Sequence, residues 1–508
     1  MVAILAFFTG LLIWGMKTTP KGFVPAEDMG TIFSDISLAP GTSQERTEEI
    51  LTEIDSIVRS VPETEFTLRV VGRSIISGTG SSYGMVLARL KLWDERERDV
   101  KEIIGELFAK TASIKDAKII FFSPPTIQGF GNTAGFEFQL QDKSGGDINK
   151  FNEVATSFLG ALSQRPEIQY ATTSFNPNFP QYQIDVNVPK IKQSGLTVND
   201  VMSVLQGYYG GVYASNFNKF GKQYRVIYQA EPGSRKNLQS LNSIYVRNAK
   251  GEMAPVSEFI TMKQVYGPQV ISRFNLFTSI SVNGTPNAGY SSGDAMKAIE
   301  EVAKTTLPPG YDYEFSGLSR EESSGGNQTL YIFLLCVVFV YFLLAAQYES
   351  YILPLAVLFS LPIGLAGVFV FDKIFEVDNN IYTQITLVML VGLLAKNAIL
   401  IVEYAVDRRK KGMSIVEAAV SGATARLRPI LMTSFAFIFG LLPLMLSKGV
   451  GAAGNTSIGT GAVGGMLIGT IFGVLVIPIL FIIFQNLQEK VSSKKTDDDE
   501  EVGAEGTA

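Results

Sequence analysis

Long uncharged stretches in the last third of the chain constrain its fold most strongly. Four of them reach the roughly 20 residues that a helix needs to cross the apolar core of a bilayer, and the first nearly does. The stretches are Leu330–Ala346, Ile352–Phe371, Ile381–Val402, Pro429–Ser447 and Thr456–Phe484. With a shorter apolar run at Met1–Met16, they predict a polytopic α-helical membrane protein of six transmembrane helices.

One lysine interrupts the third stretch. Lys396 is the only charge in Ile381–Val402 and lies more than two helical turns from either end. Its side chain is too short to reach the lipid headgroups from there. An ammonium at that depth is costly unless it is paired, so by default it marks an ion or proton pathway. A local ion pair without a transport role is the alternative.

Composition excludes several classes of function. The chain has no histidine, one cysteine and a net charge of −5, and no G-x-x-x-x-G-K-[ST] motif. Histidine-based catalysis and metal sites are therefore absent, and neither nucleic-acid binding nor ATP hydrolysis is expected. We predict no enzyme activity, no cofactor and no metal.

Basic residues set the expected orientation. Six of them precede Pro429, whereas the neighbouring loops at Asp372–Asn380 and Lys448–Asn455 carry one lysine each. The positive-inside rule then places residues 403–428 and the C-terminal tail in the cytoplasm, and residues 17–328 on the opposite side. The six are Arg408, Arg409, Lys410, Lys411, Arg426 and Arg428.

Residues 17–328 are predicted to form a large α+β insertion. Hydrophobic periodicity over residues 30–125 gives the order β-α-β-β-α-β, the split βαβ unit of ferredoxin-like domains. A second copy begins at Phe136 and resumes at Phe277, so residues 181–270 form a separate insertion. It is predicted to hold a helix near Val198–Leu205 and a hairpin around Asn218–Lys222.

Several motifs resemble the resistance-nodulation-division superfamily of proton-driven exporters, and its hydrophobe/amphiphile efflux branch in particular. They are Gly392–Tyr404, Arg426–Ser434, Gln347–Ser350 and Gly459–Gly465 in the membrane part, and Gln44–Thr47, Leu90–Trp93 and Gly135–Phe138 in the insertion. The resemblance covers essentially the whole chain, which looks like the C-terminal half of such a pump.

The resemblance implies a proton relay driven by the proton motive force. Its residues would be Lys396, Asn397, Glu403, Arg426 and Thr433. The two aspartates that pair with the lysine in the family are missing, and no carboxylate is expected in mid-membrane here. An N-terminal half carrying those transmembrane aspartates is therefore an expected partner. Helix-end anchoring for Arg426 and Glu403, and a bond from Thr433 to its own backbone, are the alternatives.

The resemblance also implies substrate contacts. A glycine-rich switch loop would run over Gly72, Gly78 and Gly80. Most of the positions that match the family's deep pocket are aliphatic and one is an arginine, Arg73, so we expect anionic amphiphiles or bile-salt-like compounds to be preferred over stacked aromatic drugs. The expected substrate-binding residues are Leu68, Arg73, Ile75, Leu87, Phe136, Phe138 and Leu140. Plain core packing is the alternative for the two phenylalanines.

The resemblance divides the chain into six parts and implies a pump in the inner membrane of a Gram-negative bacterium. It implies a homotrimer that works with a periplasmic adaptor and a TolC-like outer-membrane channel. The parts are a truncated transmembrane helix (1–16), a first porter subdomain (17–134), a second (135–180 with 271–328), a docking subdomain (181–270), a five-helix transmembrane bundle (329–485) and an acidic cytoplasmic tail (486–508).

Three other readings stay open. A metal exporter of the same superfamily would need methionine ligands, and Met85 stands alone near the pocket loop. A membrane-anchored periplasmic scaffold or translocation accessory would not need a buried lysine. The chain could also be an inactive fragment.

Overall fold

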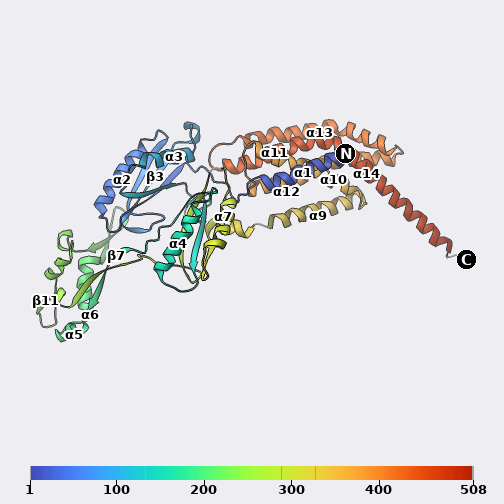
Figure 1. The fold of residues 1–508 in the computed structure, drawn as a ribbon. Coiled ribbons are helices and arrows are strands. Elements are labelled where there is room, and N and C mark those ends of the chain that lie inside the picture. Colours follow the sequence, from blue (N-terminus) through green and yellow to red (C-terminus); the bar gives the residue numbers. More distant parts are fainter. Residues whose placement is uncertain (1, 132, 288, 326–327, 506–508) are drawn as a thin grey trace. The chain divides into compact units, whose positions relative to one another are not determined.

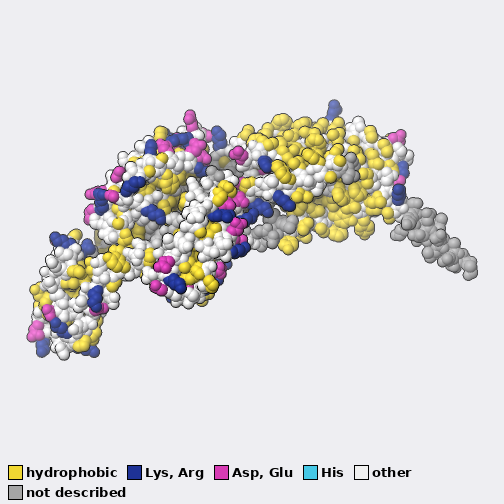
Figure 2. All heavy atoms as spheres, viewed as in Figure 1, with side chains coloured by type: hydrophobic (Ala, Val, Ile, Leu, Met, Phe, Trp, Pro, Cys, Tyr) yellow, Lys and Arg dark blue, Asp and Glu magenta, His cyan; other side chains and the backbone are white. Residues whose placement is uncertain are grey.

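The computed structural model describes residues 2–131, 133–287, 289–325 and 328–505. It consists of two compact units. Residues Asn176–Val270 form the smaller unit, for which the sequence predicted 181–270, and the rest of the chain forms the larger one. The larger unit contains a helical part, whose face in Figure 2 carries mostly apolar side chains, and an α/β part rich in charged side chains.

The helical part contains five segments that are long and apolar enough to cross a membrane, counted over the described residues. A sixth apolar helix, α1, has 17 residues, so its spanning role stays a prediction. The helices are α1 (Val2–Thr18), α9 (Gln328–Tyr348), α10 (Leu353–Leu358), α11 (Leu361–Ile374), α12 (Ile381–Lys410), α13 (Ile415–Met445) and α14 (Ala452–Glu505) (Figure 1).

The second apolar stretch is broken into α10 and α11. The hydroxyl of Ser360 donates to the carbonyl of Val357, and Pro362 stands in the first turn of α11, where a missing N–H costs nothing. α11 then continues to Ile374, beyond the predicted end at Phe371. Asp372 therefore belongs to a membrane helix, and the prediction that assigned it to a loop was wrong.

α13 begins 14 residues before the apolar stretch that predicted it. Ser414 accepts a hydrogen bond from the backbone of Glu417, whose carboxylate accepts in return from Ser414. This capping box starts the helix at Ile415, and the segment that follows is too polar for a hydropathy reading to detect. Arg426 and Arg428 thus lie within α13, not in a loop as predicted.

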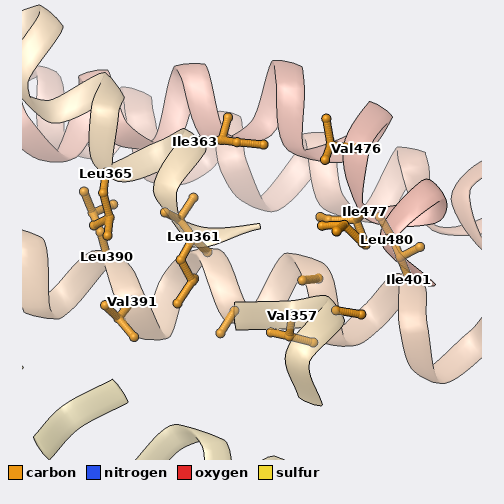
Figure 3. Packing of buried hydrophobic residues seen from close by; sticks show 14 of the residues in the cluster. Val357, Leu361, Ile363, Leu365, Leu390, Val391, Ile401, Val476, Ile477 and Leu480 are labelled. Atoms are coloured by element: carbon orange, nitrogen blue, oxygen red, sulfur yellow. The ribbon is translucent and has the colours of Figure 1, made fainter. Parts of the chain in front are cut away.

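Glycines allow the membrane helices to approach closely. A Cβ added at Gly367 of α11 would lie 2.7 Å from the carbonyl oxygen of Gly464 in α14, and one at Gly469 would lie 3.1 Å from the Cα of Gly364. The surrounding core is aliphatic: Leu361, Leu365, Leu390, Val391, Ile477 and Leu480 interdigitate between α11, α12 and α14 (Figure 3).

The first α/β subdomain is a four-stranded antiparallel sheet with two helices. The strand order is β2-β3-β1-β4, and the residues of α2 and α3 supply the apolar core together with one sheet face. The helix α2 is capped by Ser43, whose side chain accepts from the backbone N–H of Arg46. The elements are β1 (Thr31–Leu38), α2 (Gln44–Arg59), β2 (Thr64–Arg73), β3 (Thr79–Leu90), α3 (Val100–Thr111) and β4 (Ala117–Phe122).

The second subdomain repeats this arrangement from two separate segments. Its sheet has five strands: β14, β5 and β15 follow one another, and both β6 and the short β13 pair with β14. β14 thus fills the position that β3 has in the first sheet. The elements are β5 (Phe136–Asp142), α4 (Ile148–Leu162), β6 (Ile168–Thr172), β13 (Ser272–Phe274), β14 (Phe277–Pro286), α7 (Ser292–Thr306), β15 (Tyr311–Phe315) and α8 (Gly317–Gly325).

The smaller unit has its own core around Ile191, Val201, Ile244 and Phe259. The predicted helix and hairpin are present as α6 and as β8 with β9. Its elements are β7 (Phe179–Val186), α5 (Val188–Gln193), α6 (Val198–Leu205), β8 (Val212–Lys219), β9 (Lys222–Tyr228), β10 (Tyr245–Arg247), β11 (Met253–Pro255) and β12 (Ile260–Gly267).

Candidate functional site

Lys396 lies in the middle of α12 and is exposed in this chain. Its neighbours Ala395 and Asn397 are buried against the other helices, so the lysine points away from the bundle core. No side chain among the described residues forms an ion pair with it. The cation therefore stands at mid-membrane depth on an open face of the bundle.

A small polar network lies next to Lys396, on the side of α12 that faces the bundle core. The amide nitrogen of Asn397 donates to the hydroxyl of Ser434 at 3.3 Å, and the hydroxyl of Thr470 donates to the same oxygen at 2.9 Å. These three buried residues tie α12 to α13 and α14. The sequence analysis named Asn397 but missed Ser434 and Thr470, although Ser434 adjoins the predicted Thr433.

The other predicted relay residues do not meet Lys396. The hydroxyl of Thr433 donates to the carbonyl of Ile430 in its own helix, at 3.1 Å. The guanidinium of Arg426 lies 5.1 Å from the ring centroid of Tyr404, and Glu403 is exposed. In this conformation the alternative reading of Thr433 describes its contact. Arg426 lies within α13 and not at a helix end, and the relay roles of both residues stay predictions.

The open face of the first sheet gathers several predicted substrate residues. Leu68 of β2 and Leu87 of β3 are direct cross-strand partners, and Leu68 is 53% exposed. Val70 and Met85 form the next pair on the same face, because strand side chains alternate between faces. The strands thus present an aliphatic surface on the side away from α2 and α3.

The glycine-rich segment from Gly72 to Gly80 forms a loop at the end of that surface. Gly72 and Gly78 have φ angles of +85° and +99°, in a region that side-chain-bearing residues rarely adopt. Between them, the hydroxyl of Ser74 accepts from the backbone N–H groups of Ile76 and Ser77. The conformation of this loop is therefore fixed by backbone geometry and local hydrogen bonds.

Asp35 anchors the same loop from β1, and the sequence analysis did not identify it. One carboxylate oxygen accepts from the N–H groups of Ile76 and Ser77, and the other accepts from the Ser77 hydroxyl at 2.7 Å. Burial raises the pKa of Asp35, whereas the Ser77 and Ile76 hydrogen bonds and the charge of Lys118 lower it. The net shift of the pKa is upward, so the Asp35 carboxylate takes up a proton at a higher pH than an exposed aspartate does.

We expect Asp35→Asn to loosen this loop without unfolding the subdomain. The amide is isosteric but lacks the charge that strengthens three hydrogen bonds, each worth about 1.5–3 kcal/mol when charge-assisted. Hydrogen exchange at Ile76 and Ser77 should accelerate on the order of tenfold or more. The amide of Val86 in the adjoining strand is the internal control, and unchanged exchange in the loop would contradict the anchoring role.

Phe136, Phe138 and Leu140 are fully buried between the second sheet and its helices. The ring of Phe138 packs edge-on against Phe158 of α4. This conformation does not present them to a ligand, so their role in substrate binding stays a prediction. The opposite face of the same strand carries Gln139, whose amide donates to the hydroxyls of Ser281 and Ser316.

The profile of the AcrB/AcrD/AcrF family matches residues 1–485. The chain belongs to this family. The resemblance to the hydrophobe/amphiphile branch of the resistance-nodulation-division exporters is thereby confirmed. Three of the four motifs that carry it within the membrane part lie on α12, α13 and α14, the helices that the Asn397 network joins, and the fourth, Gln347–Ser350, lies at the end of α9.

Named relatives in the AcrB/AcrD/AcrF family include efflux proteins of two genera. The "Multidrug/solvent efflux pump membrane transporter MepB" of Pseudomonas putida is 34% identical over 479 residues, which are 94% of this chain and 46% of MepB. The "Multidrug export protein AcrF" of Escherichia coli (strain K12) is 34% identical over 475 residues, which are 92% of this chain and 46% of AcrF. The chain thus spans about half the length of the relatives it matches.

Within the described ranges, no group of three or more histidine, cysteine, aspartate or glutamate side chains is placed to hold an ion. Met85 pairs with Val70 on the open sheet face and has no second thioether in that pair.

Proposed function

We propose that this chain is half of a proton-driven exporter of hydrophobic and amphiphilic compounds in the inner membrane of a Gram-negative bacterium. The observation that carries the proposal is Lys396, a cation in the middle of a spanning helix, exposed on the bundle and unpaired among the described residues. Such a group requires an acidic partner within the membrane.

The face around Lys396 has room for that partner. Gly392 lies one turn earlier on the same side of α12, and a Cβ added there would meet nothing within 4 Å. A helix of an N-terminal half could therefore approach the α12 backbone closely and bring the transmembrane aspartates to the lysine. A proton that neutralises one of these aspartates would release Lys396 and change the fit of the two helix surfaces.

Two sets of contacts support a path from Lys396 toward the α/β part. The Asn397–Ser434–Thr470 network links α12 to α13 and α14. At the other end of α14, the carboxylate of Glu27 accepts from the N–H groups of Ala453 and Gly454, at 3.1 and 3.0 Å. Glu27 stands four residues before β1. A shift of the first turn of α14 would therefore move Glu27 and, through it, the start of the first sheet.

The proposal extends to assembly. The two subdomains with the strand order of a split βαβ unit would be ferredoxin-like porter subdomains on the periplasmic side, and residues 181–270 would be the docking subdomain. We propose a homotrimer that acts with a periplasmic adaptor and a TolC-like outer-membrane channel. The substrate surface would be the open face of the first sheet under the glycine-rich loop.

Export is tested in pump-deficient bacteria that express this chain together with an N-terminal half. We expect cells to accumulate less of a fluorescent cationic dye and of a bile salt, and an uncoupler that collapses the proton gradient should restore accumulation. Efflux that persists without the gradient would reject proton coupling. If the two halves are expressed and the cells still accumulate as much dye and bile salt as cells without the pump, the export proposal is rejected.

The same assay tests the substrate class. Arg73 is exposed at the end of β2, where the glycine-rich loop begins, so we expect it to favour anionic amphiphiles. Arg73→Ala should lower bile-salt efflux relative to dye efflux by about tenfold, the worth of one charged contact. Arg69→Ala is the matched control, because Arg69 turns to Thr52 of α2 on the other face. An unchanged ratio of bile-salt efflux to dye efflux in Arg73→Ala would contradict the preference for anionic amphiphiles.

A further inference from the structure

Asp372 is a carboxylate inside the membrane bundle that the relay described above does not use. It lies in the last turn of α11 and its residue surface is 0% exposed. Neither carboxylate oxygen has a hydrogen-bond partner among the described residues. Its burial is complete within this chain, so no second half is needed to enclose it.

Three helices form its surroundings. A Cβ added at Gly461 of α14 would lie 3.7 Å from Oδ1 of Asp372 and 3.2 Å from Cγ2 of Thr386 in α12. The carboxylate therefore lies between α11, α12 and α14. The hydroxyl of Thr460, next to Gly461, is also buried without a partner among the described residues. Unsatisfied buried polar groups are rare and point to something that completes them.

Within the part of the chain that the structure describes, no charged side chain pairs with Asp372. Lys373 turns outward, with its ammonium 4.0 Å from the ring centroid of Trp14 in α1. The carboxylate of Glu27 is engaged by the first turn of α14. None of the surrounding titratable groups pairs with Asp372. From α1, α11, the following loop, α12 and the segment before β1, these groups are Lys17, Lys373, Glu376, Asp378, Tyr382 and Glu27.

An unpaired carboxylate costs far less in such a place when it carries a proton. Polar side chains also lead from the outer end of the bundle toward it. Asn380 caps α12 and donates to the hydroxyl of Ser457 in α14 at 2.9 Å. Thr383 and Thr386 follow on successive turns of α12, and both are fully buried. Their hydroxyls donate to the backbone carbonyls of Asp378 and Tyr382. Polar side chains thus line the interval between the outer end of the bundle and Asp372.

We propose that Asp372 is a second proton-binding site, which exchanges protons with the periplasmic side through the polar residues at the outer end of α12 and α14. The site is separate from Lys396, which lies ten residues beyond Thr386, or about 15 Å along α12. Leu390 and Leu394 fill the interval with apolar core. The role of this proton in transport rests on the proposed export function, but its binding does not.

Infrared difference spectroscopy on the purified full chain in lipid nanodiscs tests the site without any transport. A protonated carboxylic acid has a carbonyl stretching band that a carboxylate lacks. We expect one such band to be present at acidic pH, to disappear at alkaline pH, and to be missing in Asp372→Asn. Above the midpoint the protonated fraction should fall about tenfold per pH unit.

Three results would overturn the inference. A band that persists at every pH would make Asp372 a permanently neutral structural acid. The absence of any band that depends on Asp372 would show that the carboxylate is ionised. Loss of the band on adding sodium chloride but not choline chloride, at constant pH, would indicate a sodium site. If Asp372→Asn does not fold, Asp372→Glu provides the assignment, because its band should move in frequency and remain.

Discussion

Replacing Lys396 by methionine is expected to abolish export while leaving the bundle folded. Methionine keeps most of the length and apolar surface of the lysine stem but removes the charge that the proposed aspartates need. Removal of one partner from a desolvated ion pair leaves an uncompensated charge, which corresponds to a loss on the order of a hundredfold or more. Dye accumulation in pump-deficient cells that express both halves should therefore rise to the level of cells without the pump.

The control for this result lies on the same helix. Lys410 is the last residue of α12 and is exposed, so Lys410→Met removes an equal charge outside the apolar stretch. We expect its efflux to remain within about twofold of the unmodified chain, because an exposed charge contributes little. Full efflux by Lys396→Met at equal protein level would mean that the lysine has only a local structural role, and the proton-coupling proposal would fail with it.

Long uncharged stretches located the membrane helices but not their polar extensions. The start of α13 depends on the Ser414 capping box and on a polar first segment, which a search for uncharged stretches passes over. Asp372 was missed for the same reason, because a charge at the edge of a stretch reads as the beginning of a loop. Its burial is produced by contacts with α12 and α14, and these contacts are remote in sequence.

The α/β elements could be predicted because their apolar residues recur at every second position in the strands and every third or fourth position in the helices. Function on those elements was harder to assign. Phe136 and Phe138 occupy the core face of β5, and alternation alone does not reveal which face is covered by helices. Asp35 could not be found from local sequence, since its partners Ile76 and Ser77 are about 40 residues away.

Close contact between α11 and α14 makes Gly367 intolerant of a side chain. A Cβ at this position would lie 2.7 Å from the carbonyl oxygen and 3.2 Å from the carbonyl carbon of Gly464, and 2.9 Å from the Cβ of Ile468. Backbone atoms cannot rotate away as a side chain can, so Gly367→Ala must separate the two helices. Such overpacking costs about 1–3 kcal/mol, which exceeds the helix-propensity gain of roughly 1 kcal/mol for alanine.

We therefore expect Gly367→Ala to lower the thermal unfolding midpoint of the purified chain by several degrees, and to reduce the yield of folded protein. Gly440→Ala is the matched control, because Gly440 lies within α13 and a Cβ there would meet nothing within 4 Å. There only the propensity term acts, so the midpoint should stay constant or rise. Equal midpoints for the two variants would show that α11 and α14 are not in backbone contact at this point, and that the enclosure of Asp372 by the same pair of helices is looser than the structure has it.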